Sequence, residues 1–352
     1  MSSEKVHIVP YTISKLRQSL KENDMPHELM PKIRQISYIH NPCVSDDTVV
    51  LVVAKSPDGA LIGYMGVFPE QLQKPNTYIS WGITLYIDSQ YRGKGYGDIL
   101  NAEIMKYAKG LYLVINHVPA TARILEKKGY EELFYDKYQL YVSRWNEHKG
   151  RYLSLKSVAN QIDKCVFKRH STKIHLLNDI EFEYVKSIDD ETYRFITEHS
   201  ADDMFVRSRD ILNWILQYPF TIETPLVNKT NRKYYFSCSY KTNALYAVKI
   251  YFKQELVGFL ILRNRDGNLT LLYRYFKDAY REYVYATVTE HINALKPQTF
   301  TTTDSVLTDF LKQQLKPVRV LNSKFRLSFP KQFLEIDVEN GYIQGGDGDM
   351  FI

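Results

Sequence analysis

A glycine-rich turn is the part of this sequence whose residue types and spacing most directly indicate chemistry. Residues 89–98 read Ser-Gln-Tyr-Arg-Gly-Lys-Gly-Tyr-Gly-Asp, between an apolar run at 78–87 and a helical pattern at 99–109. Such a turn at a helix N-terminus binds anions, because closely spaced backbone N–H groups point at a phosphate and the helix dipole favours its charge. Glycine lets the backbone approach where a Cβ would obstruct it. The stretch therefore predicts a site for a phosphate-bearing ligand.

A histidine offers a second reactive group. His117 follows a short apolar run at 111–116, at the carboxyl end of a predicted strand. Ligands of open α/β sheets bind at this end of the strands, and the pKa range of imidazole suits a general base that acts on an ammonium nucleophile. A histidine that only stabilises the end of the strand is the alternative. We take His117 as the candidate catalytic residue.

The composition limits the kind of protein. The chain has 352 residues, 44% of them hydrophobic, and this length suits two folded domains. A net charge of +6 permits an anionic cofactor or substrate but does not indicate a nucleic-acid partner, for which a concentrated basic face is expected. Cys43, Cys165 and Cys238 are widely spaced, so we expect reduced thiols and no metal site. No apolar run approaches the roughly 20 residues of a membrane span, and no secretory leader is recognised. We expect a cytoplasmic protein that has no membrane partner.

The elements that position the turn follow from hydrophobic periodicity. A short strand and two helices are predicted before residue 40, and a hairpin at 48–68 turns at Ser56-Pro57-Asp58-Gly59, where proline presets φ and glycine supplies a positive φ. The strand at 78–87 leads into the glycine turn. Because a helix separates that strand from the one at 111–116, the two are expected to be parallel neighbours. A helix at 120–128 and a strand at 133–142 complete this part of the chain.

The same order of elements recurs from Glu181 onward. The pattern predicts helices, a hairpin, a third strand, a helix, a strand, a helix and a last strand at 325–329. Where the glycine turn should recur, Lys277-Asp278-Ala279 contains no glycine, so the second copy is predicted to lack the phosphate site. Residues 144–179 are rich in lysine and arginine and predict a basic helical connector. We therefore divide the chain into domains at 1–143 and 180–352, with this connector between them.

Residues 48–140 resemble the GCN5-related N-acetyltransferases, the GNAT superfamily. The family signature, Arg/Gln-x-x-Gly-x-Gly/Ala, lies between the fourth strand and the third helix, and Arg92-Gly93-Lys94-Gly95-Tyr96-Gly97 matches it. Downstream, Ile124-Leu125-Glu126-Lys127-Lys128-Gly129-Tyr130 is similar to the end of a family helix. The resemblance implies an α/β fold with a mixed central sheet of the acyl-CoA N-acyltransferase type. With the repeat described above, this fold is expected twice in tandem.

The resemblance also implies acetyl-CoA as cosubstrate. Its pyrophosphate would be held by the backbone amides of the turn, from Arg92, Gly93, Lys94, Gly95, Tyr96 and Gly97, with Asp98 in the first helical turn. The main chain of Tyr86 and Ile87 would pair with the pantetheine arm. In this family an amine attacks the acetyl group directly, so the lack of a nucleophile motif is no objection. The acceptor is expected to be a small molecule, such as an amino sugar or a nucleotide sugar, in the crevice between the two halves.

Two positions depart from the family pattern. Many members carry an asparagine after the fifth strand and a tyrosine acid in the last helix, and the matching positions here are Val118 and Leu125. This departure motivates one alternative, a CoA-binding or interaction protein without catalysis. The other alternative is a peptidoglycan-type aminoacyl transferase, which takes aminoacyl-tRNA and does not need the glycine turn, so residues 92–97 argue against it.

Overall fold

The computed structural model describes residues 6–26, 29–74, 76–142, 179–218, 220–223, 239–336 and 341–348. The predicted basic connector, apart from Asp179, lies outside the described residues, and the division into domains remains a prediction. Among the described helices, none is both long enough and apolar enough to cross a membrane.

The first half contains the predicted helices, hairpin and glycine turn. Its elements are β1 (His7–Thr12), α1 (Ile13–Glu22), α2 (Lys32–Ile39), β2 (Val49–Lys55), β3 (Leu61–Lys74), β4 (Tyr78–Ile87), the 3₁₀ helix η1 (Ser89–Tyr91), α3 (Tyr96–Tyr107), β5 (Leu111–Ile115), α4 (Pro119–Glu126) and β6 (Tyr130–Tyr141). The predicted hairpin is confirmed, because β2 and β3 pair antiparallel. The glycine turn separates η1 from α3.

The second half repeats this order with additional short strands. Its elements are β7 (Ile180–Val185), α6 (Asp190–Glu198), β8 (Val206–Arg207), α7 (Arg209–Gln217), β9 (Ile222–Glu223), β10 (Ser239–Tyr240), β11 (Asn243–Phe252), β12 (Glu255–Arg265), β13 (Asn268–Phe276), η7 (Asp278–Tyr280), α8 (Arg281–Leu295), β14 (Thr299–Thr302), α9 (Ser305–Leu315), β15 (Arg319–Pro330) and η8 (Lys331–Ile336). By position, β13, η7, α8 and β14 correspond to β4, η1, α3 and β5.

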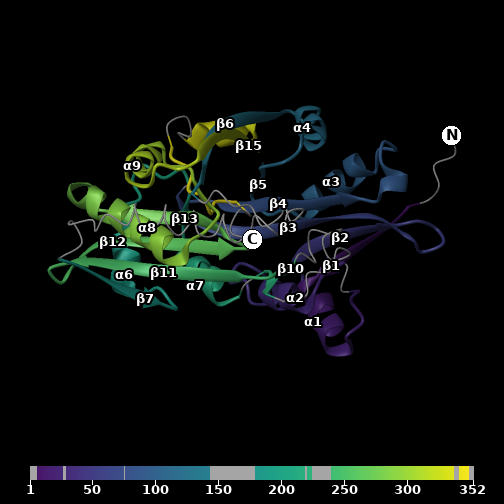
Figure 1. Ribbon diagram of the computed structural model, residues 1–352. Coiled ribbons are helices and arrows are strands. Elements are labelled where there is room, and N and C mark those ends of the chain that lie inside the picture. Colours follow the sequence, from purple (N-terminus) through teal and green to yellow (C-terminus); the bar gives the residue numbers. More distant parts are fainter. Residues whose placement is uncertain are drawn as a thin grey trace, which may run out of the picture.

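One mixed sheet runs through both halves (Figure 1). Its strand order is β1-β2-β3-β4-β5-β15-β6-β14-β13-β12-β11-β7, and β8 pairs with β3 beside this row. As predicted, β4 and β5 are parallel, and so are β13 and β14. The mixed α/β fold predicted from the sequence is therefore confirmed, and the repeated order of elements is consistent with a tandem arrangement.

The two halves exchange their last strands. β15, the last strand of the chain, lies between β5 and β6 of the first half, and β6 in turn lies between β15 and β14 of the second half. β15 pairs antiparallel with β6 from Arg319, opposite Tyr141, to Pro330, opposite Tyr130. It also pairs with β5 through Leu327 and Ser328. Each half therefore completes its sheet with a strand of the other.

Three groups of buried side chains stabilise this sheet. On one face α1, α2, α6 and α7 share a single apolar core with strands of both halves, and these helices lie on the lower side of the sheet in Figure 1. We call this the inner face. On the other face α3 covers the first half, while α8 and α9 cover the second. The shared inner core and the exchanged strands make the two halves one packed unit.

We predict that neither half folds alone. A chain of residues 1–142 lacks β15, so facing edges of β5 and β6 stay unpaired, and unpaired strand edges promote aggregation. Residues 179–352 likewise lack β6. Each fragment expressed alone should aggregate, whereas the two expressed together should form a one-to-one complex with a cooperative thermal transition. Size-exclusion chromatography and thermal unfolding provide the measurement. A monomeric, cooperatively unfolding 1–142 fragment would contradict the strand exchange.

Candidate active site

The glycine turn forms an open cradle at the start of α3. Gly93 and Gly95 have φ values of +75° and +85°, a conformation that glycine adopts without steric cost. A Cβ placed on either residue would meet no atom within 4 Å, so space lies directly against the backbone. Gly95 is the N-cap of α3, and the dipole of that helix favours a negative group in front of it. These features fit the pyrophosphate of CoA.

Side chains around the cradle are exposed and basic. The Arg92 Nε donates a hydrogen bond to the carbonyl of Ile87 at 3.0 Å, and the Lys94 ammonium lies 5.4 Å from the centre of the Tyr91 ring. Tyr96 packs edge-on against Tyr91. Both cations are therefore held beside the turn by contacts of their own, where they add positive charge next to the backbone amides.

The remaining predicted cofactor residues lie close by. Gly97 is in the first turn of α3, where a Cβ would come within 3.2 Å of Ile124 on α4. Asp98 is in the same turn. Tyr86 and Ile87 end β4, opposite Tyr64 and Gly63 of β3. The structure thus brings the predicted cofactor residues together at the end of β4 and the start of α3.

β4 and β5 separate before they reach this end. The two strands pair only through Ile79, Ser80 and Trp81 of β4. Beyond them Thr84 has a φ of +56° and the register with β3 shifts, as in a β-bulge, which bends a strand. Among the residues that the structure describes, no strand pairs with β4 past Trp81 on the β5 side. An extended ligand can therefore align with this free edge, as the resemblance implies for pantetheine.

A segment near the end of the chain reaches this point from the inner face. We call residues 341–348 the tail segment. Gly348 lies against Ile115 of β5 and Trp81 of β4, so closely that a Cβ on it would clash with the Ile115 side chain. Earlier in the segment a Cβ on Gly346 would clash with the ring of Tyr273. Glycine is required at both positions because the backbone passes directly over these side chains.

A buried ion pair holds the tail segment in place. The Arg207 Nε donates to the Glu70 Oε1 at 2.6 Å, and both side chains are at most 1% exposed. The same guanidinium donates to the carbonyls of Gly346 at 2.8 Å and Gly348 at 2.7 Å. Glu70 also accepts a hydrogen bond from the indole of Trp81 at 2.8 Å. Burial alone would lower the pKa of Arg207, but the charge of Glu70 raises it, so the arginine remains protonated.

His117 lies on a different side of β5. Its Nε2 is 2.7 Å from the Ser328 hydroxyl of β15 and 4.0 Å from a Glu132 oxygen of β6. Its Nδ1 is 3.4 Å from the carbonyl of Val118. The side chain is 4% exposed, and burial lowers the pKa of the imidazole. The structure therefore joins His117 to both exchanged strands, and its predicted role as a base is untested.

The two positions that depart from the family pattern differ in their surroundings. Val118 is the N-cap of α4 and is 62% exposed, whereas Leu125 is buried with 1% exposed. Leu125 packs in the core beneath α3. Neither side chain can donate a proton, so proton transfer at this site would have to come from other groups.

The second half has a corresponding gap, but its strand edge is already in use. β13 and β14 pair only through Asn268, Leu269 and Thr270 of β13. Past them the Gln344 side chain bonds the backbone of Arg274, accepting from its N–H at 3.3 Å and donating to its carbonyl at 3.0 Å. The Gly346 N–H donates to the carbonyl of Leu272 at 2.8 Å. The tail segment thus takes hydrogen bonds along β13 that an extended ligand would need.

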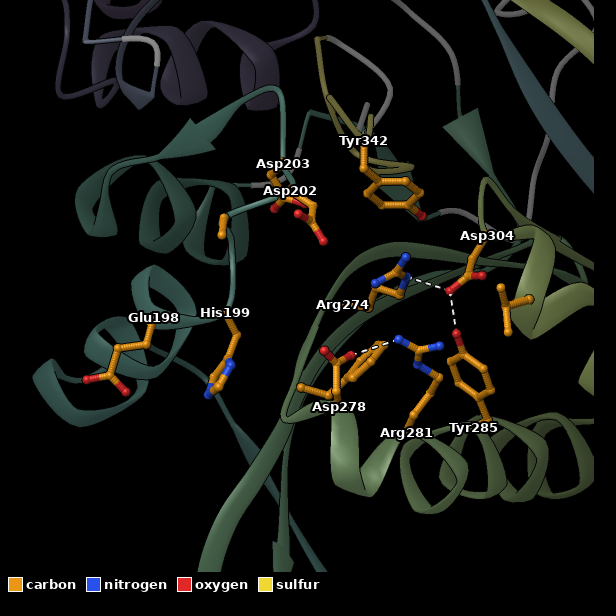
Figure 2. Close-up of a pocket in the computed structure, with 13 residues that line it drawn as sticks. Glu198, His199, Asp202, Asp203, Arg274, Asp278, Arg281, Tyr285, Asp304 and Tyr342 are labelled. Carbon is orange, nitrogen blue, oxygen red and sulfur yellow. Dashed lines mark hydrogen bonds and ion pairs between the residues drawn. The ribbon is translucent and has the colours of Figure 1, made fainter. Parts of the chain in front are cut away.

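A polar pocket of about 350 Å³ opens beside this second gap. Figure 2 shows Arg274 and Tyr285 both directed at the carboxylate of Asp304. The Arg274 Nε lies 2.6 Å from the Asp304 Oδ2, and the Tyr285 hydroxyl donates to the same oxygen at 2.9 Å. Asp278 pairs with Arg281 at 2.8 Å. Burial raises the pKa of Asp203, opposite them, to about 7. Carboxylates outnumber cations among the residues that line this pocket, and the connection from β13 to α8, which begins with Lys277 and Asp278, has no glycine turn, so the pocket disfavours a pyrophosphate.

Comparison with known proteins agrees with this geometry. Residues 13–130 match the Acetyltransferase (GNAT) family. This part of the chain is a GNAT domain. GNAT membership supports acyl transfer in general. No protein with a curated function matches the sequence.

Solved structures with the same fold extend over nearly the whole chain. A putative acetyltransferase from Pyrococcus horikoshii is 10% identical, with a TM-score of 0.51 over 99% of this chain and 98% of its own. A GCN5-related N-acetyltransferase from Anabaena variabilis is 14% identical, with a TM-score of 0.50 over 92% of this chain and 72% of its own. A glucosamine N-acetyltransferase region of a fungal β-N-acetylglucosaminidase is 12% identical, with a TM-score of 0.50 over 94% of this chain and 38% of its own. At these identities the likeness shows the fold alone.

The buried pair and the tail segment were not predicted from the sequence. Glu70 and Arg207 lie far apart in the sequence, and no motif around either residue indicates that the two form a pair. The one signal in the sequence was Gly345-Gly346-Asp347-Gly348. Its glycines are needed because the backbone there lies directly against residues of β5 and β13. The tail segment lies outside the GNAT domain in the sequence, but in the structure it forms the inner boundary of the gap between β4 and β5 of that domain.

We predict that Arg207→Met lowers the free energy of unfolding by about 3–5 kcal/mol, because Glu70 is then left as a buried charge without its partner. Glu70→Gln combined with Arg207→Met should recover part of that loss. As a control, Arg209→Met removes an exposed pair with Asp190 and should change the value by less than about 1 kcal/mol. Urea unfolding gives all four values. Equal effects for the two arginines would contradict the role given to the pair.

Proposed function

We propose that this protein transfers an acetyl group from acetyl-CoA to an amine of a small acceptor, by direct attack of the amine. The observation that supports it most is the pairing of two features in the first half: the open glycine cradle before α3 and the free edge of β4 past Trp81. The second half has neither a glycine turn nor a free strand edge at the matching position. The proposal is therefore one acetyl-CoA site per chain.

The residues of this chain would bind and orient the cosubstrate. Backbone amides from Arg92 to Gly97 would hold the pyrophosphate, and Arg92 and Lys94 would add positive charge. Main-chain groups of Tyr86 and Ile87 would align the pantetheine along β4. Acetyl-CoA, when bound, supplies an acyl group activated as a thioester. The chain's contribution is mainly to hold the two reactants together, which by itself can account for several kcal/mol of a reaction barrier.

The acceptor would approach from the inner face. On that face the gap between β4 and β5 is bounded by Trp81, Ile115 and the tail segment. Acceptor amines are protonated at neutral pH, so a base must remove a proton before attack. We propose an amino sugar or a nucleotide sugar as the acceptor class. One neighbour in fold, the fungal region named above, is described as a glucosamine N-acetyltransferase, which makes glucosamine a sensible first test.

A non-catalytic CoA-binding protein is the second candidate. It is favoured by Val118 and Leu125, which carry no group that could protonate the leaving thiolate. The two candidates differ in one measurable property, the release of free thiol that depends on an acceptor.

The test is an assay of thiol release from acetyl-CoA with glucosamine, nucleotide-linked amino sugars, polyamines and peptides as acceptors. The proposal expects release that depends on one class of amine and saturates with its concentration, together with an acetylated product of the expected mass. CoA binding without acceptor-dependent release by any member of the panel would favour the non-catalytic candidate.

We predict that Gly95→Ala weakens CoA binding by at least about tenfold, or about 1.4 kcal/mol. The new Cβ would stand in the space where the phosphate is expected. Gly59→Ala is a matched control, because Gly59 has the same φ of +85° and equally open surroundings but lies in the β2–β3 turn. Isothermal titration with CoA measures both. Equal affinities in the two variants would sink the assignment of the cradle.

We predict for His117, if it is the base, that His117→Gln lowers kcat/KM by about 10²–10⁴-fold. A histidine base must be neutral to act, and burial lowers the pKa of His117. In the wild type kcat/KM should therefore fall only as the pH drops below about 6.5, and the variant should lose this acid limb. Ser328→Ala keeps the imidazole and removes its partner on Nε2, so the limb should persist. An unchanged acid limb in His117→Gln would assign the residue to structure alone.

A further inference from the structure

A small cavity lies on the inner face where the exchanged strand β6 meets the second half. Its volume is about 50 Å³. The residues that line it are Lys137, Arg263, Asn268, Thr270, Leu271, Thr301, Thr302, Thr303, Phe325 and Gly345. They come from β6, β12, β13, β14 and the residue that follows it, β15 and the tail segment. None of these described residues is aspartate or glutamate, and the two that carry a charge, Lys137 and Arg263, are both cations.

Lys137 has no charged partner among the residues that the structure describes. No hydrogen bond or ion pair of its ammonium to any described residue is found, and Asp136, its neighbour in β6, points to the opposite face of the strand. Burial lowers the pKa of Lys137, and the charge of Arg263 lowers it further. Lys137 is only partly buried, so its ammonium keeps some contact with solvent but gains no acceptor from the described residues. The surroundings of Lys137 therefore favour an anion.

Neutral groups of the cavity also present donors. The Asn268 side-chain oxygen accepts hydrogen bonds from the hydroxyls of Thr299 at 3.0 Å and Thr301 at 3.1 Å. The Asn268 NH₂ group remains available to a ligand, and an amide NH₂ group only donates hydrogen bonds. The Thr270 hydroxyl adds a group that can donate or accept. Donors from several strands thus line one space, and none of the described residues that line it carries a carboxylate.

The size of the cavity limits the anion. One water molecule needs roughly 10–15 Å³ in this measure, so about 50 Å³ has room for a group of a few heavy atoms. A tetrahedral oxyanion has this size and accepts hydrogen bonds on all sides, as the lining requires. A whole nucleotide is too large for the cavity, but the terminal phosphate group of a larger ligand could enter it.

We propose that this cavity binds a tetrahedral oxyanion, phosphate or sulfate, held by Lys137 together with Arg263 and the side chain of Asn268. The anion would connect β6 of the first half to β12 and β13 of the second, next to Gly345 of the tail segment. The site is separate from the glycine cradle in front of α3, and the proposal does not depend on the acetyltransferase function.

Thermal unfolding at constant ionic strength tests the proposal. The wild type, Lys137→Met and Lys324→Met are compared in chloride, with inorganic phosphate, sulfate or glucose 1-phosphate replacing part of it. Lys324 is a matched control, since it is an exposed lysine on β15 that pairs with the residue next to Lys137. Phosphate bound at the glycine cradle would raise the Tm of all three proteins equally, so only the difference between them reports this cavity.

A ligand that binds only the folded state raises the Tm as its concentration increases. The proposal expects this rise in the wild type and in Lys324→Met, with an apparent Kd at least about tenfold weaker in Lys137→Met. In chloride alone Lys137→Met should be about as stable as the wild type, because the charge that it removes is partly solvated and has no partner among the described residues, so a folding defect is recognised separately. A response to glucose 1-phosphate alone would assign the site to the phosphate of a larger ligand. Equal responses in all three proteins to every anion would overturn the proposal.

Discussion

The buried pair between Arg207 and Glu70 is the interaction on which the arrangement of this chain depends. A guanidinium is costly to bury unless its several N–H groups find acceptors. Here Glu70 of β3 and two carbonyls of the tail segment supply them, while the Trp81 indole holds the same carboxylate. A lysine could not replace it, because an ammonium has no planar fork to reach a carboxylate and two carbonyls together. One side chain of the second half therefore fixes β3 and β4 of the first half and the end of the described chain relative to one another.

The position of the tail segment makes the two gaps in the sheet unequal. It runs along β13, where Gln344 and Gly346 take backbone hydrogen bonds, and then passes over Trp81 and Ile115, where Gly348 lies against the two side chains. In the second half the tail segment occupies hydrogen-bonding groups on the edge of β13. In the first half the edge of β4 stays free past Trp81, and the segment only bounds the gap on the inner face. The absence of glycine at 277–279 and the hydrogen bonds of the tail segment along β13 are thus two independent features that both favour a single cosubstrate site.

Local features of the fold were predictable from the sequence because local patterns determine them. The strand at 78–87 was predicted with its observed bounds, since its apolar run and the glycine turn that follows it are local features of the sequence. The strand exchange was not predictable in this way. Only residues 325–329 of β15 were predicted as a strand, because Asn322, Ser323 and Lys324 are exposed and polar. The residue pattern of a strand also does not indicate which strands it will pair with. The partner of each last strand depends on the whole sheet.

The same distinction separates the parts of the candidate site. The cradle was predictable because a glycine turn between a strand and a helix carries its function in the backbone, and Gly93 and Gly95 have the positive φ that this role requires. A base, in contrast, is defined by what surrounds a side chain. His117 stands at the predicted end of β5, but its ring contacts Ser328 and Glu132 from the two exchanged strands, which could not be placed beside it from the sequence. Its acidity, and hence any role in proton transfer, is set by strands that enter from distant parts of the chain, so the chemistry of the first half depends on the folding of the second.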